Sequence, residues 1–137
     1  MLSKSDYRYF KKAHQAALIS DFEKTHVGCI AVYQGNIIAI GCNTHKTHPK
    51  QQYYNRFRTI RYGDSKYLPK IHCLNVIRNM DINFTKVKLY VYRTRRDQDF
   101  GLAKPCASCM AAIKDLGIRQ IYYTTDDGYV FEKLENR

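Results

Sequence analysis

The stretch Lys104-Pro105-Cys106-Ala107-Ser108-Cys109-Met110 decides the fold of this chain. Its two thiols are three residues apart and are followed by a short helical pattern, 110–116, which Gly117 ends. This pattern predicts that both sulfur atoms lie on the first turn of a helix. Free backbone amides and the positive end of the helix dipole favour thiolate there, and thiolate is the form of cysteine that binds Zn²⁺. The stretch therefore predicts a metal site at the start of a helix.

His72 is the best candidate for a third metal ligand. It follows Lys70-Ile71 and leads directly into an amphipathic helix pattern. Three protein ligands would leave the fourth tetrahedral position of a zinc ion open for water, which distinguishes a catalytic site from a closed structural one. Two other interpretations of a lone Cys-x-x-Cys pair stay open: a redox pair, and one half of a four-cysteine zinc site.

Three features together are typical of one family: Pro105 directly before the first cysteine, His72 at a helix start 34 residues before Cys106, and a strand pattern between them. The chain resembles the cytidine/deoxycytidylate deaminase superfamily, whose signature is H-x-E…P-C-x-x-C. The segments 27–32 and 37–43 resemble the family's opening hairpin, and 89–92 and 117–123 resemble the two following strands. The resemblance covers nearly all of the chain. It implies one Zn²⁺ per chain, held by His72, Cys106 and Cys109.

Asn43 ends the G-x-N sequence that closes this hairpin. By resemblance, its side chain would hydrogen-bond the sugar or the backbone of the substrate. The alternative is that Asn43 is a turn residue without a role in binding.

Composition predicts a single deaminase-like domain, residues 1–137. The formal charge of +11 and the pI near 9.5 indicate anionic partners such as nucleotides or nucleic acid. The chain has five cysteines, no leader pattern at its start and no apolar run near 18 residues. We therefore expect a cytoplasmic protein with no membrane partner.

The hydrophobic periods predict alternating helices and strands. Helices are expected at 3–20, at 71–81 and after Cys106; strands at 27–33, 37–42, 86–94 and 119–125, with a short terminal element at 129–134. A charged turn is expected to begin at Arg93. The order α-β-β-α-β-α-β predicts an α/β fold, a three-layer α/β sandwich around a mixed central sheet.

The segment from Asn43 to Lys70 has no sustained period, and a connection of this length in a compact domain is usually functional or disordered. Its cations alternate with aromatic residues, a combination that suits phosphates and unstacked bases. The predicted partner is a nucleotide or a single-stranded nucleic acid, bound through Lys46, Lys50, Tyr53, Arg56 and Arg58. Alternatively, the rings pack this segment onto the domain and the cations are simply solvated.

The sequence departs from the family at one position. The residue two after the histidine is a glutamate in the family, where it moves protons during the reaction. Here the chain reads His72-Cys73-Leu74, so Leu74 stands at that position. A second alignment follows from helical spacing, because Cys73, Val76, Ile77 and Met80 form an i, i+3, i+4, i+7 face on which Cys73 replaces the glutamate.

These features predict a zinc-dependent hydrolytic deaminase of a cytosine-type base, present in a nucleoside, a nucleotide or a single-stranded nucleic acid. Without the glutamate, its activity should be low or absent. The alternative function is a catalytically silent, zinc-containing nucleic-acid-binding module. Family resemblance and the 12 tyrosines are also consistent with a homo-oligomer.

Overall fold

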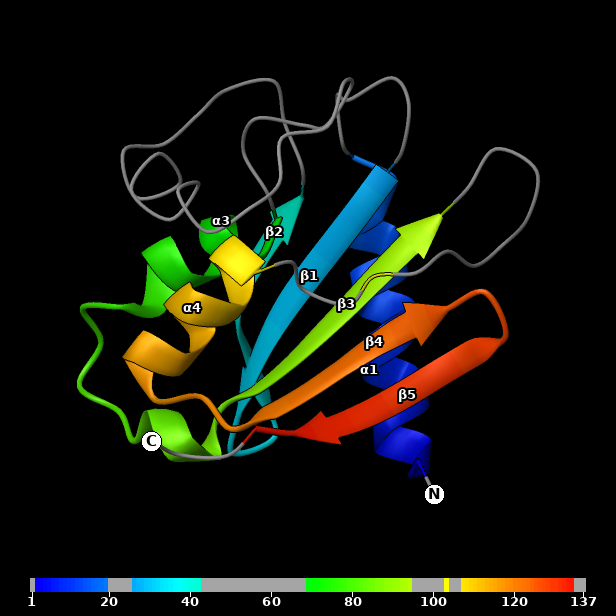
Figure 1. Ribbon diagram of the computed structural model, residues 1–137. Helices are drawn as coiled ribbons and strands as arrows, with labels where there is room; N and C mark the ends of the chain where they lie inside the picture. Colours follow the sequence, from blue (N-terminus) through cyan, green and yellow to red (C-terminus); the bar gives the residue numbers. More distant parts are fainter. Residues whose placement is uncertain (1, 20–25, 43–68, 95–102, 104–106, 135–137) are drawn as a thin grey trace.

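The computed structural model describes residues 2–19, 26–42, 69–94, 103 and 107–134 of the chain. Within them, a five-stranded sheet lies between two layers of helices (Figure 1). One layer is α1 (Lys4–Ala17), and the other is formed by α3 (Pro69–Ile77) and α4 (Ala107–Leu116). The predicted three-layer α/β sandwich is confirmed.

The strands are β1 (His26–Tyr33), β2 (Asn36–Cys42), β3 (Lys88–Thr94), β4 (Gln120–Thr125) and β5 (Gly128–Lys133). Their order across the sheet is β2-β1-β3-β4-β5. The β3–β4 pair is parallel and the other neighbouring pairs are antiparallel, so the sheet is mixed as predicted. The carboxyl ends of β2, β3 and β4 therefore lie at the same end of the sheet, which we call its carboxyl edge. Helices α3 and α4 also begin there (Figure 1).

The β1–β2 hairpin turns at the expected residues. Gln34 and Gly35 both have positive φ, at 51° and 81°. Positive φ at both central residues is what a tight hairpin turn needs to match the twist of its strands. The hairpin places β2 at the edge of the sheet, where α3 packs over β2 and β1.

Helix α1 begins with a capping box. Ser3 Oγ accepts a hydrogen bond from the Asp6 N–H, and Asp6 Oδ2 accepts one from the Ser3 N–H, at 3.1 Å and 2.9 Å. The helix lies very close to β1. A Cβ atom on Gly28 would overlap the backbone of α1 at Ala13 and Ala17, so this position of β1 requires glycine.

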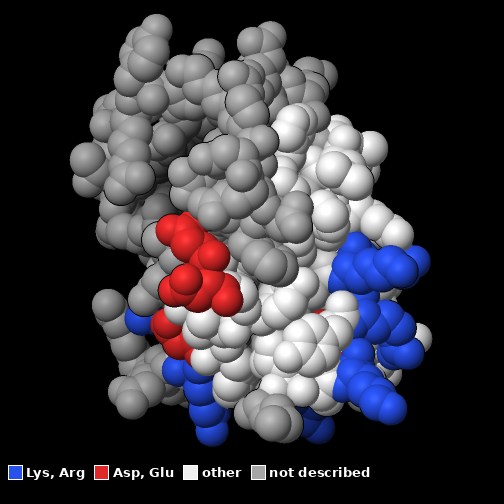
Figure 2. All heavy atoms as spheres, turned by 90° about the vertical axis from the view of Figure 1, so that its right-hand side faces the viewer, with Lys and Arg blue, Asp and Glu red and all other residues white. Residues whose placement is uncertain are grey.

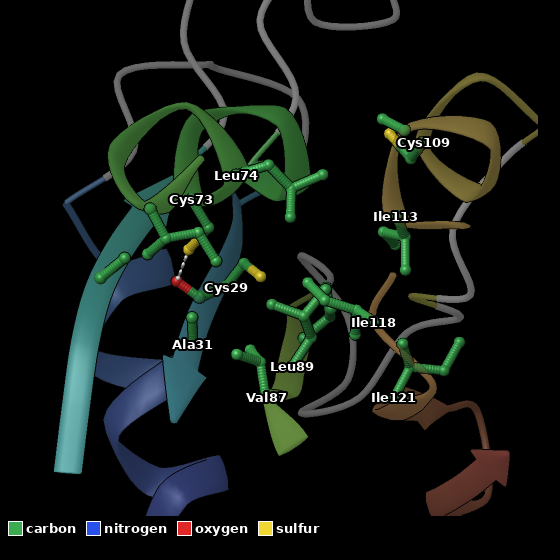
Figure 3. Close-up of a cluster of buried hydrophobic side chains, with 14 of the residues drawn as sticks. Cys29, Ala31, Cys73, Leu74, Val87, Leu89, Cys109, Ile113, Ile118 and Ile121 are labelled. Carbon is green, nitrogen blue, oxygen red and sulfur yellow. Dashed lines mark hydrogen bonds between the residues drawn. The ribbon is translucent and has the colours of Figure 1, made fainter. Parts of the chain in front are cut away.

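The sheet separates two hydrophobic cores. On the α1 side the core is aromatic: Tyr90 and Tyr122 stack at 4.3 Å, and Phe10 meets Tyr90 edge-on at 5.4 Å. On the α3 and α4 side it is mainly aliphatic and includes Leu89 and Ile113 (Figure 3). Strand β3 is central and supplies both cores, which explains why Leu89 and Val91 on one face and Tyr90 and Tyr92 on the other are all buried.

Element boundaries differ slightly from the predicted ones. The helix expected at 71–81 runs from Pro69 to Ile77, and a proline at the first helical position is favoured because it has no N–H to leave unpaired. Residues Phe84–Lys86 form a short 3₁₀ turn, η2, before β3. The terminal element is the edge strand β5. Among the described helices, none is both long and apolar enough to cross a membrane.

Candidate active site

Helices α3 and α4 begin next to each other at the edge where β2, β3 and β4 end (Figure 1). Open α/β sheets bind ligands at the carboxyl ends of their parallel strands, and β3 and β4 are the parallel pair here. The starts of the two helices, which carry the sequence-predicted ligands, therefore lie where a ligand site is expected.

Cys73 points from α3 towards the sheet. Its side chain is fully buried, and its Sγ donates a hydrogen bond of 2.9 Å to the backbone carbonyl oxygen of Cys29 in β1 (Figure 3). Burial, and then the hydrogen bonding with Cys29, raises the pKa of the Cys73 thiol well above its usual value. Cys73 is thus a neutral core residue that joins α3 to β1.

Leu74 points towards the other helix. Its side chain extends from α3 in the direction of α4, whose Cys109 and Ile113 lie opposite it (Figure 3). It is 6% exposed and belongs to the same buried hydrophobic cluster as Cys109 and Ile113, so the side chain that α3 turns towards α4 is apolar. In this arrangement Leu74 faces the neighbouring helix, whereas Cys73 faces the sheet.

The second alignment predicted that one helical face, formed by Cys73, Val76, Ile77 and Met80, is the inner face of the helix. This prediction is wrong. Val76 is 48% exposed and Met80 37% exposed, whereas Leu74 is buried together with Cys73 and Ile77. Helix α3 ends at Ile77, so Met80 lies beyond it. The buried positions are i, i+1 and i+4 because the helix contacts the sheet on one side and α4 on another.

The predicted zinc ligands are described in part. The backbone of His72 lies in α3, and Cys109 lies on the first turn of α4 with its side chain buried. The side chain of His72 and all of Cys106 lie outside the described residues. In the part of the chain that is described, no three metal-binding side chains form a cluster. An imidazole and two thiols are nevertheless a donor set that suits Zn²⁺, and the helices that carry His72 and Cys109 start side by side.

The predicted substrate contacts lie outside the described residues. They are Asn43, Lys46, Lys50, Tyr53, Arg56 and Arg58. The structure does describe where the chain enters this segment: Cys42 is the last residue of β2 and lies at the edge where α3 and α4 begin. Asn43 is the next residue in sequence.

Arg93 is a further candidate for the site, at the position where the predicted strand 86–94 and the expected charged turn overlap. It belongs to β3, near the end of the strand, and strand alternation puts it on the same face as Leu89 and Val91, which pack with α3 and α4. Its backbone N–H donates to Thr124 Oγ1 at 3.1 Å, which ties the end of β3 to the end of β4. Extending the apolar alternation of this strand by one step would have identified Arg93 as a cation on the candidate-site face.

Comparison with known proteins agrees with this architecture. The family model described as the cytidine and deoxycytidylate deaminase zinc-binding region matches residues 3–125. Two crystal structures of dCMP deaminase from the cyanophage S-TIM5, one in complex with dCMP and dUMP and one in apo form, each have a TM-score of 0.63 and 21% sequence identity to this chain. The likeness covers 90% of this chain and 82% and 84% of those chains.

RibD from Acinetobacter baumannii, in its form 2, has a TM-score of 0.52 at 14% identity. The match covers 88% of this chain and 28% of that chain. No curated protein sequence matches this chain. At these identities the structural matches establish the shared fold, whereas the family model spans α1 to the end of β4. The chain belongs to the cytidine and deoxycytidylate deaminase family.

Proposed function

We propose that this protein is a zinc-dependent hydrolytic deaminase that removes the amino group of a cytosine-type base, present in a nucleoside, a nucleotide or a single-stranded nucleic acid. The observation that carries the proposal is the adjacent start of α3 and α4 at the carboxyl edge of the sheet. Family membership supports the reaction. A dCMP deaminase of the same fold was crystallised with dCMP and dUMP, which supports a pyrimidine nucleotide as the substrate class.

His72, Cys106 and Cys109 would hold one Zn²⁺. When bound, the metal would supply a Lewis acid that activates water for attack on the amino-bearing carbon of the base. The helix start around Cys109 contributes free amides and a positive dipole end, which favour the thiolate that such a site needs. Asn43 and the cations Lys46, Lys50, Arg56 and Arg58 would contact the sugar and phosphates, and Tyr53 would contact the base.

Leu74 would limit the rate of this reaction. We infer that Leu74, rather than Cys73, stands where the family has its glutamate, because Leu74 faces α4 and the Cys73 thiol is bonded to Cys29. A positioned acid or base contributes about 10²–10⁴-fold to such reactions. Leucine cannot carry a proton, so the chain as it stands should turn over slowly or not at all.

A catalytically silent, zinc-containing nucleic-acid-binding module is the second candidate. The apolar Leu74 between the two helices favours it, since the site would then keep its metal without a proton carrier. The charge of +11 favours an anionic partner for either function.

The test is a deaminase assay on the zinc-loaded chain with cytidine, dCMP and a cytosine-containing oligonucleotide, with release of ammonia as the readout. Leu74→Glu should raise turnover by about 10²–10⁴-fold over the unmodified chain. Cys73→Glu is the matched control: it adds the same carboxylate at the neighbouring position, but against β1, and should give no gain.

The outcomes separate the two functions. If folded, zinc-loaded Leu74→Glu releases no ammonia from any substrate, the deaminase proposal is wrong and the binding module is favoured. Rapid turnover by the unmodified chain would instead show that another residue of the chain moves the proton. That result would overturn the inference that Leu74 limits the rate, but not the proposed deaminase function.

A further inference from the structure

The face of α1 that points away from the sheet is strongly basic. Four exposed cations lie on it: Lys4, Arg8, Lys11 and Lys12. At 3.6 residues per turn they fall within an arc of about 100°, opposite the buried face of the helix. Figure 2 shows Lys and Arg side chains gathered along the side of the molecule where α1 lies.

No acid on α1 offsets these charges. Asp6 is the one acidic residue of the helix, and it is 8% exposed. It turns inward, where it accepts hydrogen bonds from the Ser3 N–H and from the Tyr90 hydroxyl. The outward face of α1 therefore has four positive charges and no negative charge.

Aromatic rings lie directly beside the cations. Tyr7 is three residues after Lys4 and four before Lys11, so both lysines flank it on the helix surface. It is 51% exposed, and its ring meets that of Tyr129 in β5 edge-on at 5.4 Å. Tyr7 and Tyr129 thus begin a row of aromatic rings that continues from α1 onto the sheet.

Phe131 extends this row along the edge strand. It is 44% exposed, and its ring contacts that of Tyr122 at 4.7 Å on the α1 side of the sheet. Helix α1 packs over β1 and β3, so it leaves this part of β5 uncovered. In Figure 2, the Lys and Arg side chains on the α1 side form a group at the right of the view, and uncharged surface lies between this group and the main acidic group at the left. Further Lys and Arg side chains lie below that acidic group.

We propose that this basic aromatic face, the four cations of α1 together with Tyr7, Tyr129 and Phe131, binds single-stranded nucleic acid. The cations would neutralise phosphates, and the exposed rings would stack on bases, which are available for stacking in an unpaired strand. A second copy of this chain would fit less well, because its own charge of +11 would repel the cations. The face lies on the opposite side of the sheet from α3 and α4, so a bound strand would leave the candidate active site open.

The first test is a titration of a fluorescent oligothymidylate at several salt concentrations. Thymine has no amino group to remove, so binding is measured independently of the proposed deaminase reaction. Arg8→Gln/Lys11→Gln should weaken binding and make the log–log salt slope shallower by about 1.4, at roughly 0.7 per lost phosphate contact. The matched control Arg78→Gln/Lys114→Gln removes the same two residue types from the other helical layer and should leave the slope unchanged.

The second test concerns the rings. Phe131→Leu keeps an apolar side chain but removes the ring, and it should weaken binding about 5- to 150-fold at every salt concentration, the equivalent of 1–3 kcal/mol for one stacked base. Thermal melting checks that each variant is folded.

Three results would overturn the proposal: equal slope changes in both double variants, full affinity in Phe131→Leu, or no binding of the oligonucleotide by the unmodified chain. Sedimentation of the same variants adds a fourth. If Arg8→Gln/Lys11→Gln converts a dimer to a monomer without changing oligonucleotide affinity, the face is instead an interface between copies.

Discussion

The Tyr90 hydroxyl donates a hydrogen bond of 2.6 Å to Asp6 Oδ1 and so joins α1 to the central strand β3 across 84 residues of sequence. Burial opposes ionisation of Asp6, but the hydrogen bonds from Tyr90 and Ser3 outweigh it and hold the pKa of Asp6 below its usual value. Burial, and then the bond to Asp6, raises the pKa of Tyr90 well above its usual range. The pair therefore fixes the first turn of α1 onto the sheet.

Tyr90→Phe should lower the free energy of unfolding by about 1.5–3 kcal/mol at neutral pH, because a buried carboxylate loses a charge-assisted hydrogen bond. Since the pKa of Asp6 is depressed in the fold, the stability it contributes is present above the unfolded-state pKa of about 3.9 and is lost as pH falls through the folded value. The difference in the free energy of unfolding between Tyr90→Phe and the unmodified chain should therefore become smaller at acidic pH. Urea unfolding at neutral and acidic pH measures both effects.

Tyr123→Phe is the control for that comparison. Tyr123 also donates to a carboxylate, Glu132, at 3.0 Å, but that carboxylate belongs to a partly exposed residue of the edge strand. Loss of the Tyr123 hydroxyl should lower the free energy of unfolding by less than loss of the Tyr90 hydroxyl, since water can replace the missing donor. Equal stability of Tyr90→Phe and the unmodified chain would refute the role of the pair.

Gly28→Ala should destabilise the protein by about 1–3 kcal/mol, because the added methyl group would overlap the backbone of α1 at Ala13 and Ala17 and force the helix away from β1. Gly35→Asn is the matched control, since Gly35 has open space around its Cβ position and asparagine tolerates its positive φ. Thermal unfolding compares the two. A stable Gly28→Ala protein would mean that α1 lies farther from β1 than described.

Zinc content tests the proposed ligands directly. Cys109→Ala and Cys106→Ala should each lose the metal and with it stability, because metal binding contributes to the free energy of folding. Cys73→Ala should keep one zinc per chain while losing stability, since its thiol is bonded to Cys29. Metal analysis of the purified variants gives the answer, and a His72→Ala/Cys106→Ala double variant that retains full zinc would exclude this ligand set.

The order of the helices and strands up to β4 could be predicted because these elements have local signals in the sequence. Ser3 and Asp6 form the capping box that starts α1, and Gln34-Gly35 forms the turn that joins β1 to β2. The terminal element could not be assigned in the same way. Residues 129–134 have no clear period, and they become a strand by pairing with β4.

The buried side of α3 could not be predicted from its sequence. An apolar i, i+3, i+4 pattern identifies the inner face of a helix that rests on one surface, but α3 contacts both the sheet and α4. Val76 is therefore exposed although it is apolar, and Leu74 is buried although it lies outside the expected face. Arg93 lies where two expectations overlapped, the strand 86–94 and a charged turn from Arg93 onwards; pairing with β1 keeps residues through Thr94 in β3, so the strand prediction is correct at this end. The homo-oligomeric state and the cytoplasmic location of the protein stay predictions.

Arg93 leads to the last prediction, which concerns recognition of a substrate phosphate. It is a cation on the face of the sheet that carries α3 and α4, near the carboxyl end of β3 and close to the edge where those helices begin. A guanidinium group there suits a phosphate, because it offers several N–H donors in a planar fork. If the substrate is a nucleotide, Arg93→Gln should weaken binding of dCMP by about 10- to 100-fold, the loss expected for a charge-assisted hydrogen bond of about 1.5–3 kcal/mol.

Deoxycytidine provides the control ligand, since it differs from dCMP by the phosphate alone. Its affinity should be the same for Arg93→Gln and the unmodified chain, which also shows that the variant keeps its fold. Titration calorimetry with both ligands measures this without requiring turnover, so the prediction holds even if Leu74 abolishes catalysis. If Arg93→Gln weakens the binding of dCMP and deoxycytidine equally, Arg93 does not contact the phosphate. Its role would then be to maintain the end of β3, where its backbone N–H donates to Thr124.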